Sequence, residues 1–237
     1  MQQVDVTING ARLIADISGA LYWPAAGLLM VADLHFEKGS AYAARGVALP
    51  PYDTVETLNR LQAVLARFKP KRLVSLGDSF HDINWQDRMA AADWQRLRDM
   101  AAGLEMHWVT GNHDPQPPRD LPGMAHEEWA LSYDGDLVLR HEPLARQHVA
   151  FSAGEIAGHL HPCGKIRQRG RNLRRRCFVH DEQRLILPAF GALTGNLNVR
   201  DAAFADLFVD RNYEAVLLGT ARLAPVAGKR LLPDHAG

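Results

Sequence analysis

Five short motifs in this sequence carry side chains that bind divalent metal ions. Imidazole, carboxylate and amide groups together suit moderately hard cations such as Mn²⁺, Fe²⁺ or Zn²⁺, whereas a structural zinc site would favour thiolates. We therefore expect a metal centre wherever the fold brings the motifs together. In chain order they are Asp33-Leu34-His35, Gly77-Asp78, Gly111-Asn112-His113-Asp114, His141-Glu142-Pro143 and Gly158-His159-Leu160-His161.

The candidate ligands include too few carboxylates to neutralise the charge of two divalent cations. Asp33 and Asp78 alone would face two divalent ions, which leaves a strongly positive centre. Hydroxide and an anionic substrate would neutralise that charge, and a phosphoester has the required character. The motifs therefore predict hydrolysis of a phosphate ester at a two-metal centre.

The first three motifs follow predicted strands. Continuous apolar runs over 28–32, 73–76 and 106–109 are typical of buried strands, and a motif follows each of them closely. In an open α/β sheet, the carboxyl ends of the strands form the edge where ligands bind. We therefore expect these three motifs to converge at one edge of a sheet.

Two helices are predicted between these strands. Apolar side chains recur at helical spacing over 53–68, where Asp53 and Glu56 are placed as a capping pair. A second helix is predicted over 85–102. Strand and helix thus alternate in the first half of the chain, as in α/β folds.

The remaining segments are predicted to be mostly strands. Residues 4–8 and 11–15 alternate apolar and polar side chains around Asn9-Gly10, which predicts a hairpin. The whole pattern predicts a single α/β domain over residues 1–237, in which two β-sheets pack face to face with helices outside. A loose tail is expected over 231–237. Short strands with no convincing helix between them are predicted at 137–139, 155–157, 184–187, 204–208 and 215–218.

The composition is that of an ordinary soluble globular protein, with 47% apolar and 23% charged residues. The sequence shows neither a transmembrane run nor a secretory signal, so we expect a cytoplasmic protein without membrane contact. Cys163 and Cys177 are then expected to be reduced. Lysine plus arginine and aspartate plus glutamate balance at 27 each, so nucleic-acid affinity would need a local basic patch.

A basic run of this kind follows the last metal motif. It contains no acidic residue, and its side chains could follow a phosphate backbone if the segment folds along the site. A solvated hairpin explains the run equally well, because runs of like charge are often simply exposed. The run consists of Lys165, Arg167, Arg169, Arg171, Arg174, Arg175 and Arg176.

The five motifs, in this order, resemble the signature of the calcineurin-like metallophosphoesterases over roughly residues 28 to 161. The resemblance implies a four-layer α/β/β/α sandwich and a bridging hydroxide as the nucleophile. It also implies that Asp78 bridges two metals and that His113, oriented by Asp114, protonates the leaving oxygen or stabilises charge. The remaining ligands are implied as Asp33, His35 and His161 for one metal, and Asn112, His141 and His159 for the other.

One departure from the signature narrows the resemblance. Many members carry aspartate three residues after the bridging aspartate, where this chain has His81. With Leu187-Pro188-Ala189-Phe190-Gly191, the motifs are similar to those of the bacterial ligase-associated DNA damage response endonucleases. This similarity implies a Mn²⁺-dependent phosphodiesterase, with Fe²⁺ or Zn²⁺ as alternatives, that acts on DNA in repair beside a DNA ligase and a helicase. It leaves strand preference and homo-oligomer formation open.

The residues themselves leave two further questions open. His81 either touches substrate phosphate or orients a metal ligand. Arg174, Arg175 and Arg176 are expected to bind substrate if the substrate is DNA. The alternatives to a nuclease are an enzyme for a small phosphodiester or phosphomonoester, for which the basic run would be incidental, and a non-catalytic metal-binding scaffold of a repair complex.

Overall fold

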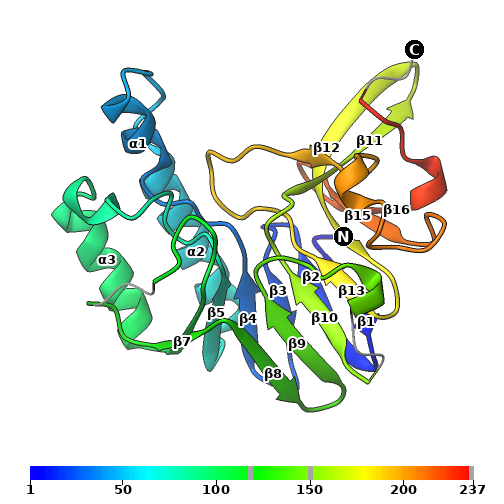
Figure 1. Cartoon of the computed structure of the whole chain (residues 1–237), viewed down its shortest axis with the longest axis horizontal. Helices are drawn as coiled ribbons and strands as arrows, with labels where there is room; N and C mark the ends of the chain where they lie inside the picture. Colours follow the sequence, from blue (N-terminus) through cyan, green and yellow to red (C-terminus); the bar gives the residue numbers. More distant parts are fainter. Residues whose placement is uncertain (117–119, 149–151, 235–237) are drawn as a thin grey trace.

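Two β-sheets pack face to face in the computed structural model, which describes residues 1–116, 120–148 and 152–234 (Figure 1). Their apolar inner faces form a shared core that includes Met30 and Val74 from one sheet and Leu139 and Ile156 from the other. A second core joins the outer face of the first sheet to two helices. The predicted arrangement of two packed sheets flanked by helices is therefore confirmed.

The first sheet has seven strands in chain order. Its first four strands pair antiparallel with one another, and from the fourth strand to the seventh the pairing is parallel. Polar residues that follow the parallel strands consequently share one edge. The strands are β1 (Gln3–Ile8), β2 (Ala11–Asp16), β3 (Leu21–Trp23), β4 (Leu28–Val31), β5 (Arg72–Leu76), β6 (Glu105–Val109) and β7 (Met124–His126).

The second sheet is built from the later part of the chain. Its central strand β10 pairs in parallel with both β9 and β13, so the ends of β9 and β10 also lie at one edge. The basic run forms the hairpin of β11 and β12, which extends beyond the sandwich in Figure 1. The strands are β8 (Glu128–Ser132), β9 (Asp136–Arg140), β10 (Gly154–Ala157), β11 (Pro162–Gln168), β12 (Arg171–His180), β13 (Arg184–Ile186), β14 (Leu197–Asn198), β15 (Glu214–Leu218) and β16 (Leu223–Ala227).

Helices α2 (Asp53–Phe68) and α3 (Ala91–Ala102) cover the outer face of the first sheet, and the short α1 (Lys38–Ala44) contacts α2. Short 3₁₀ turns contribute to the rest of the surface. Among the described residues, no helix is both long and apolar enough to cross a bilayer. The turns are η1 (Trp85–Asp87), η2 (Arg146–His148), η3 (Ala202–Phe204) and η4 (Gly228–Arg230).

The predicted helix over 85–102 is wrong in its first turns. Trp85 lies in η1, where its ring stacks on Phe80 with centroids 3.7 Å apart, and α3 begins only at Ala91. The Arg88 guanidinium pairs with Asp82 at 2.6 Å and helps to hold this irregular segment. Tertiary packing of one aromatic side chain has therefore overridden helical propensity.

Two other local predictions are wrong for related reasons. The strand expected at 204–208 is the 3₁₀ turn η3 followed by further turns, because the Asp201 carboxylate accepts a hydrogen bond from the Ala203 N–H and caps η3. The tail is ordered as far as residue 234: Leu231 is buried, and Lys165 donates to the carbonyl oxygens of Pro233 and Asp234. Residues 235–237 lie outside the described part.

The proposed capping pair of α2 is also wrong. The residues at the start of this helix instead bind the segment that leads away from the metal centre. Asp53 is the first helical residue, and its carboxylate accepts a hydrogen bond from the Gly39 N–H at 2.9 Å instead of capping its own helix. Next to it, the Thr54 hydroxyl donates to Glu37 at 2.8 Å and accepts from the Glu37 N–H at 2.9 Å. These buried bonds tie α2 to the segment that directly follows His35.

Replacing Thr54 with valine should lower the free energy of unfolding by about 1–3 kcal/mol, because it leaves the buried Glu37 N–H and the Oε1 atom of its carboxylate without their partner. Thr54→Ser keeps the hydroxyl and should retain most of the stability. Urea denaturation of both variants measures the difference. Equal stability of the two variants would contradict the role assigned to this hydroxyl.

Candidate metal centre

The seven predicted metal ligands come from the ends of five strands. Asp33 and His35 follow β4, Asp78 follows β5, and Asn112 follows β6 in the first sheet. The second sheet supplies the other three. These are His141 after β9 and the pair His159 and His161 after β10. Because the two sheets pack against each other, residues far apart in the sequence meet at one edge of the sandwich.

One group of ligand atoms consists of Asp33, His35 and His161, whose candidate donor atoms all lie within 4.8 Å of one another. His161 Nε2 lies 3.3 Å from Asp33 Oδ1 and also 3.3 Å from His35 Nε2. Asp33 is fully buried, and its carboxylate additionally accepts the His159 backbone N–H. This grouping is the one that the resemblance implied for the first metal.

A second group consists of Asp78, His141 and His159. His141 Nε2 lies 3.4 Å from Asp78 Oδ1 and 3.1 Å from His159 Nδ1. The side-chain oxygen of Asn112 lies 3.0 Å from the same nitrogen, so it adds a fourth donor atom. The mixture of carboxylate, imidazole and amide oxygen fits a divalent cation of intermediate hardness.

The Asp78 carboxylate stands between the two groups. Its Oδ1 faces His141, while its Oδ2 lies 3.7 Å from His35 Nε2 in the first group. A carboxylate placed between the two groups could serve as a ligand shared by two metals. The structure therefore brings all seven sequence-predicted ligands together, with Asp78 at the shared position.

The electrostatics of this edge favour positive charge. Burial opposes ionisation of His141, but its hydrogen bond to Asp78 and the charges of Asp33 and Asp78 outweigh burial and raise its pKa to about 9. Burial likewise opposes ionisation of Asp78, yet its contacts with His141 and the His113 N–H lower the pKa of its carboxyl group. By contrast, burial lowers the pKa of His35, which stays neutral as a ligand must. Cations would satisfy the two buried carboxylates.

Backbone groups fix the orientation of two ligand rings, a feature that the sequence does not reveal. His141 Nδ1 lies 3.0 Å from the Leu76 carbonyl oxygen, and His161 Nδ1 lies 3.2 Å from that of Gly195. A carbonyl accepts a hydrogen bond only, so each Nδ1 carries a proton and Nε2 is the nitrogen that a metal would take. At His141 a cation would replace the proton that the raised pKa places on Nε2.

Close packing explains two glycines of the motifs. A Cβ atom on Gly77 would lie 2.3 Å from His141 Nδ1, and one on Gly111 would lie 2.3 Å from both the backbone nitrogen and Oδ1 of Asp78. Any larger residue would push a ligand out of place. The glycine before Asp78 and the glycine before Asn112 are therefore required by side chains from other motifs.

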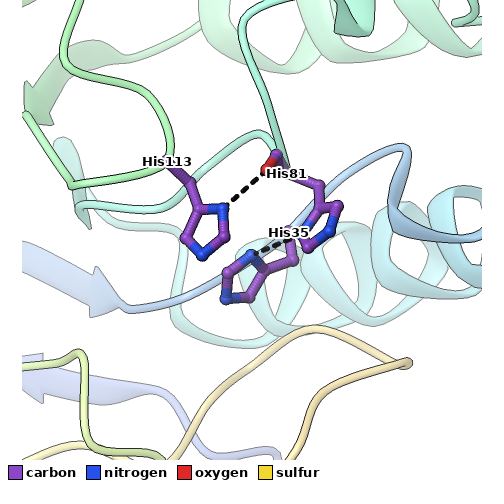
Figure 2. A group of neighbouring side chains, drawn as sticks. All are labelled: His35, His81 and His113. Atoms are coloured by element: carbon purple, nitrogen blue, oxygen red, sulfur yellow. Dashed lines mark hydrogen bonds between the residues drawn. The ribbon is translucent and has the colours of Figure 1, made fainter. Parts of the chain in front are cut away.

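His113, the predicted general acid, lies at the rim of the centre with His35 and His81 (Figure 2). Its Nδ1 lies 2.7 Å from the His81 carbonyl oxygen and must therefore donate, which leaves Nε2 to exchange a proton. That Nε2 atom is 4.0 Å from Asp78 Oδ2, and the side chain is 39% exposed. A proton held at Nε2 can thus reach both the centre and the solvent.

Asp114 does not orient His113 as the resemblance implied. Its Oδ2 accepts the backbone N–H groups of Ser79 at 2.7 Å and Phe80 at 3.1 Å, whereas Oδ1 has no hydrogen-bond partner in the described part of the chain. Burial, only partly offset by these bonds, raises its pKa to about 7. Asp114 therefore holds the turn that follows Asp78, and the His81 carbonyl takes the orienting role.

The side chain of His81 is buried against His35 instead of pointing into solvent. The two Nδ1 atoms lie 3.4 Å apart, and the His81 ring stacks on His113 with centroids 4.9 Å apart (Figure 2). Burial and the nearby Lys38 charge lower the pKa of His81 to about 4, so the ring is neutral at neutral pH. Of the two roles left open by the sequence, this contact favours orientation of the ligand His35.

The three arginines expected to bind substrate lie on β12, beside the centre and outside it. Arg174 pairs with Asp234 at 3.3 Å and donates to the Asn196 carbonyl. Arg176 donates to the Ala189 carbonyl at 2.6 Å, and Arg175 is exposed. All three line a cavity of about 410 Å³. Their contact with substrate stays a prediction.

Comparison with known proteins identifies the family. The model of the calcineurin-like phosphoesterase family matches residues 28–219. No curated protein sequence gives a significant match. The solved structure of the Pseudomonas putida nuclease MPE is 31% identical with a TM-score of 0.71, and the match covers 94% of this chain and 100% of that one. The Escherichia coli phosphoesterase YfcE is 16% identical with a TM-score of 0.42, over 84% and 98% of the two chains. The chain belongs to the calcineurin-like phosphoesterase family and is a metal-dependent phosphoesterase.

Proposed function

We propose that this phosphoesterase is a two-metal phosphodiesterase that cleaves DNA, with a role in DNA repair. The observation that carries the proposal is the convergence of six donor residues around a seventh, Asp78, whose carboxylate stands between two groups. The similarity to a solved nuclease along nearly the whole chain supports the choice of nucleic acid as substrate. The basic hairpin beside the centre supports it further.

The residues of the centre divide the chemistry among them. Bound divalent ions lower the pKa of a water molecule and neutralise the charge of a phosphodiester. Asp33, Asp78, Asn112 and the ligand histidines would hold such ions, for which we propose Mn²⁺. His113 takes up a proton from solvent at Nε2 and donates it to the leaving oxygen of the sugar.

The cellular setting is proposed from the resemblance to ligase-associated endonucleases. In that setting the protein works in the cytoplasm beside a DNA ligase and a helicase. The metal centre itself does not specify the polynucleotide, because a small phosphoester presents the same reacting group. The decisive assay therefore offers Mn²⁺-loaded protein single-stranded DNA, double-stranded DNA, a small phosphodiester and a phosphomonoester. Turnover of the small esters without DNA cleavage would contradict the proposal.

Asp78→Ala should lower both the bound-metal content and the rate of phosphodiester hydrolysis. Loss of groups that only support metal ligands costs about 10–100-fold, so loss of a ligand shared by both groups should cost more than about 100-fold. Metal content by elemental analysis and kcat/KM measure the two effects. Asp99→Ala, on the exposed face of α3, serves as control. Near-normal turnover of Asp78→Ala would refute the metal assignment.

His113→Ala should retain bound metal but hydrolyse phosphodiesters more slowly. The loss of rate should be largest for substrates whose leaving group has to be protonated. Cleavage of DNA, which expels a poor leaving group, should fall about 10²–10⁴-fold. A p-nitrophenyl phosphodiester expels a good leaving group and should lose much less. Equal losses on both substrates would contradict proton donation by His113, and loss of metal would place it among the ligands.

Arg175→Gln should weaken DNA binding in a salt-dependent manner. Arg175 is the most suitable of the three arginines for this test, because its exposed hydrogen bond reaches only the adjacent Arg174 carbonyl, whereas Arg174 and Arg176 bind carbonyl groups of another segment. The slope of log K against log salt should become shallower by about 0.7 for a single strand if one phosphate contact is lost. Fluorescence anisotropy measures it. A slope equal to that of wild type would indicate that the arginine is only solvated.

A further inference from the structure

A cavity of about 410 Å³ adjoins the metal centre without being part of it. Helix α2, strand β12 and the loop of residues 191–196 all contribute to its wall. The same loop contacts the centre, because the Gly191 N–H donates to the Asp33 carbonyl at 3.1 Å and the Gly195 carbonyl lies 3.2 Å from His161 Nδ1. A molecule in the cavity would therefore lie next to a substrate held at the metals.

The described residues that line this cavity include four arginines and no carboxylate. Arg174 is paired with Asp234, and Arg60 on α2 is paired with Glu56 at 3.0 Å through a largely exposed contact. Arg176 forms no ion pair with any described residue. The exposed Arg60–Glu56 pair contributes little free energy, so Arg60 can exchange it for a bound anion.

Arg176 is the unusual member of the wall. Its side chain is mostly buried, and only one of its guanidinium nitrogens has an assigned partner, the Ala189 carbonyl. Burial, followed by the charge of Arg60, lowers its pKa to about 10, so it remains protonated at neutral pH. A buried charge is stabilised by a partner of opposite sign, and a bound anion would supply one.

Two neutral side chains add hydrogen-bonding capacity. The Thr194 hydroxyl makes only a 3.5 Å contact with the Gly191 carbonyl, which leaves its proton available. The side-chain oxygen of Asn196 is buried and has no partner among the described residues, so its amide can turn to present the NH₂ group. Arginine forks combined with hydroxyl and amide donors are the chemistry that binds phosphate.

We propose that this cavity, here called the arginine pocket, binds a phosphate group of the substrate strand other than the one being cleaved. The pocket is built mainly by Arg60, Arg176, Thr194 and Asn196. The inference rests on the proposed function, since only a substrate with more than one phosphate can occupy the centre and the pocket together. The pocket then discriminates a polynucleotide from a small phosphodiester.

The kinetic test compares two substrates in each variant. Arg60→Gln and Thr194→Val are assayed with a short single-stranded oligothymidylate and with bis(p-nitrophenyl) phosphate, which has one phosphate. Loss of a charged hydrogen bond should lower the ratio of kcat/KM for the oligonucleotide to that for the small ester about tenfold in Arg60→Gln. Arg60→Lys should restore part of the ratio. Arg98→Gln, an exposed arginine of α3 outside the pocket, should leave it unchanged.

A binding measurement in EDTA tests the pocket without catalysis. Anisotropy of the labelled oligonucleotide should show weaker binding by Arg60→Gln, with a salt slope shallower by about 0.7. Oligonucleotides with and without a 5′-phosphate show which phosphate the pocket binds. If Arg60→Gln weakens binding of the phosphorylated strand alone, the pocket binds a terminal phosphate. If it weakens binding of both strands equally, the pocket binds an internal phosphate.

The two proposals fail in different ways. If wild-type protein cleaves DNA but Arg60→Gln and Thr194→Val behave like Arg98→Gln in both assays, the arginine pocket is refuted and the nuclease stands. If wild-type protein cleaves no DNA, the proposed function is refuted. In that case, unchanged affinity of Arg60→Gln for the oligonucleotide in EDTA, or no binding by wild type, refutes the pocket as well.

Discussion

The structure of the centre depends on one buried carboxylate, that of Asp78, which is 3% exposed. Its two oxygens face different ligand groups, and Oδ1 also accepts the His113 N–H at 2.9 Å. A carboxylate in this environment is stable only beside positive charge and hydrogen-bond donors. Both groups of histidines and the Gly111 turn therefore have to fit around it, which explains why residues from both sheets meet within such a small volume.

The fold stabilises this arrangement against backbone strain. Asp33, His35, Asp78, His159 and His161 all have positive φ values, between 45° and 69°. Residues other than glycine adopt this conformation at a cost of order 1–3 kcal/mol each. The cost is offset by the core between the two sheets, whose strands lead directly into these residues. These turns follow the strands directly and place their ligand residues at the edge of the sandwich.

The chemistry of the centre was predictable from the sequence, whereas its supporting contacts were not. Buried strands have a continuous apolar pattern, so the positions of Asp33, Asp78 and Asn112 at strand ends follow from local sequence. The roles of Asp114 and Asp53 depend on partners that only tertiary structure supplies, namely Ser79 and Gly39. The same holds for the start of α3, where packing of Trp85 on Phe80 overrides a helical pattern. Local patterns do not encode such distant partners.

The metal centre and the residues around it have different tasks. Metal ligands recognise the reacting phosphate, which every phosphoester has, so substrate choice has to come from groups outside the seven ligands. The loop of residues 191–196 is placed to connect the two tasks, because it contacts Asp33 and His161 on one side and lines the cavity of Arg60 and Arg176 on the other. The loop that lines this cavity thus also fixes the His161 ring, because the Gly195 carbonyl accepts a hydrogen bond from His161 Nδ1.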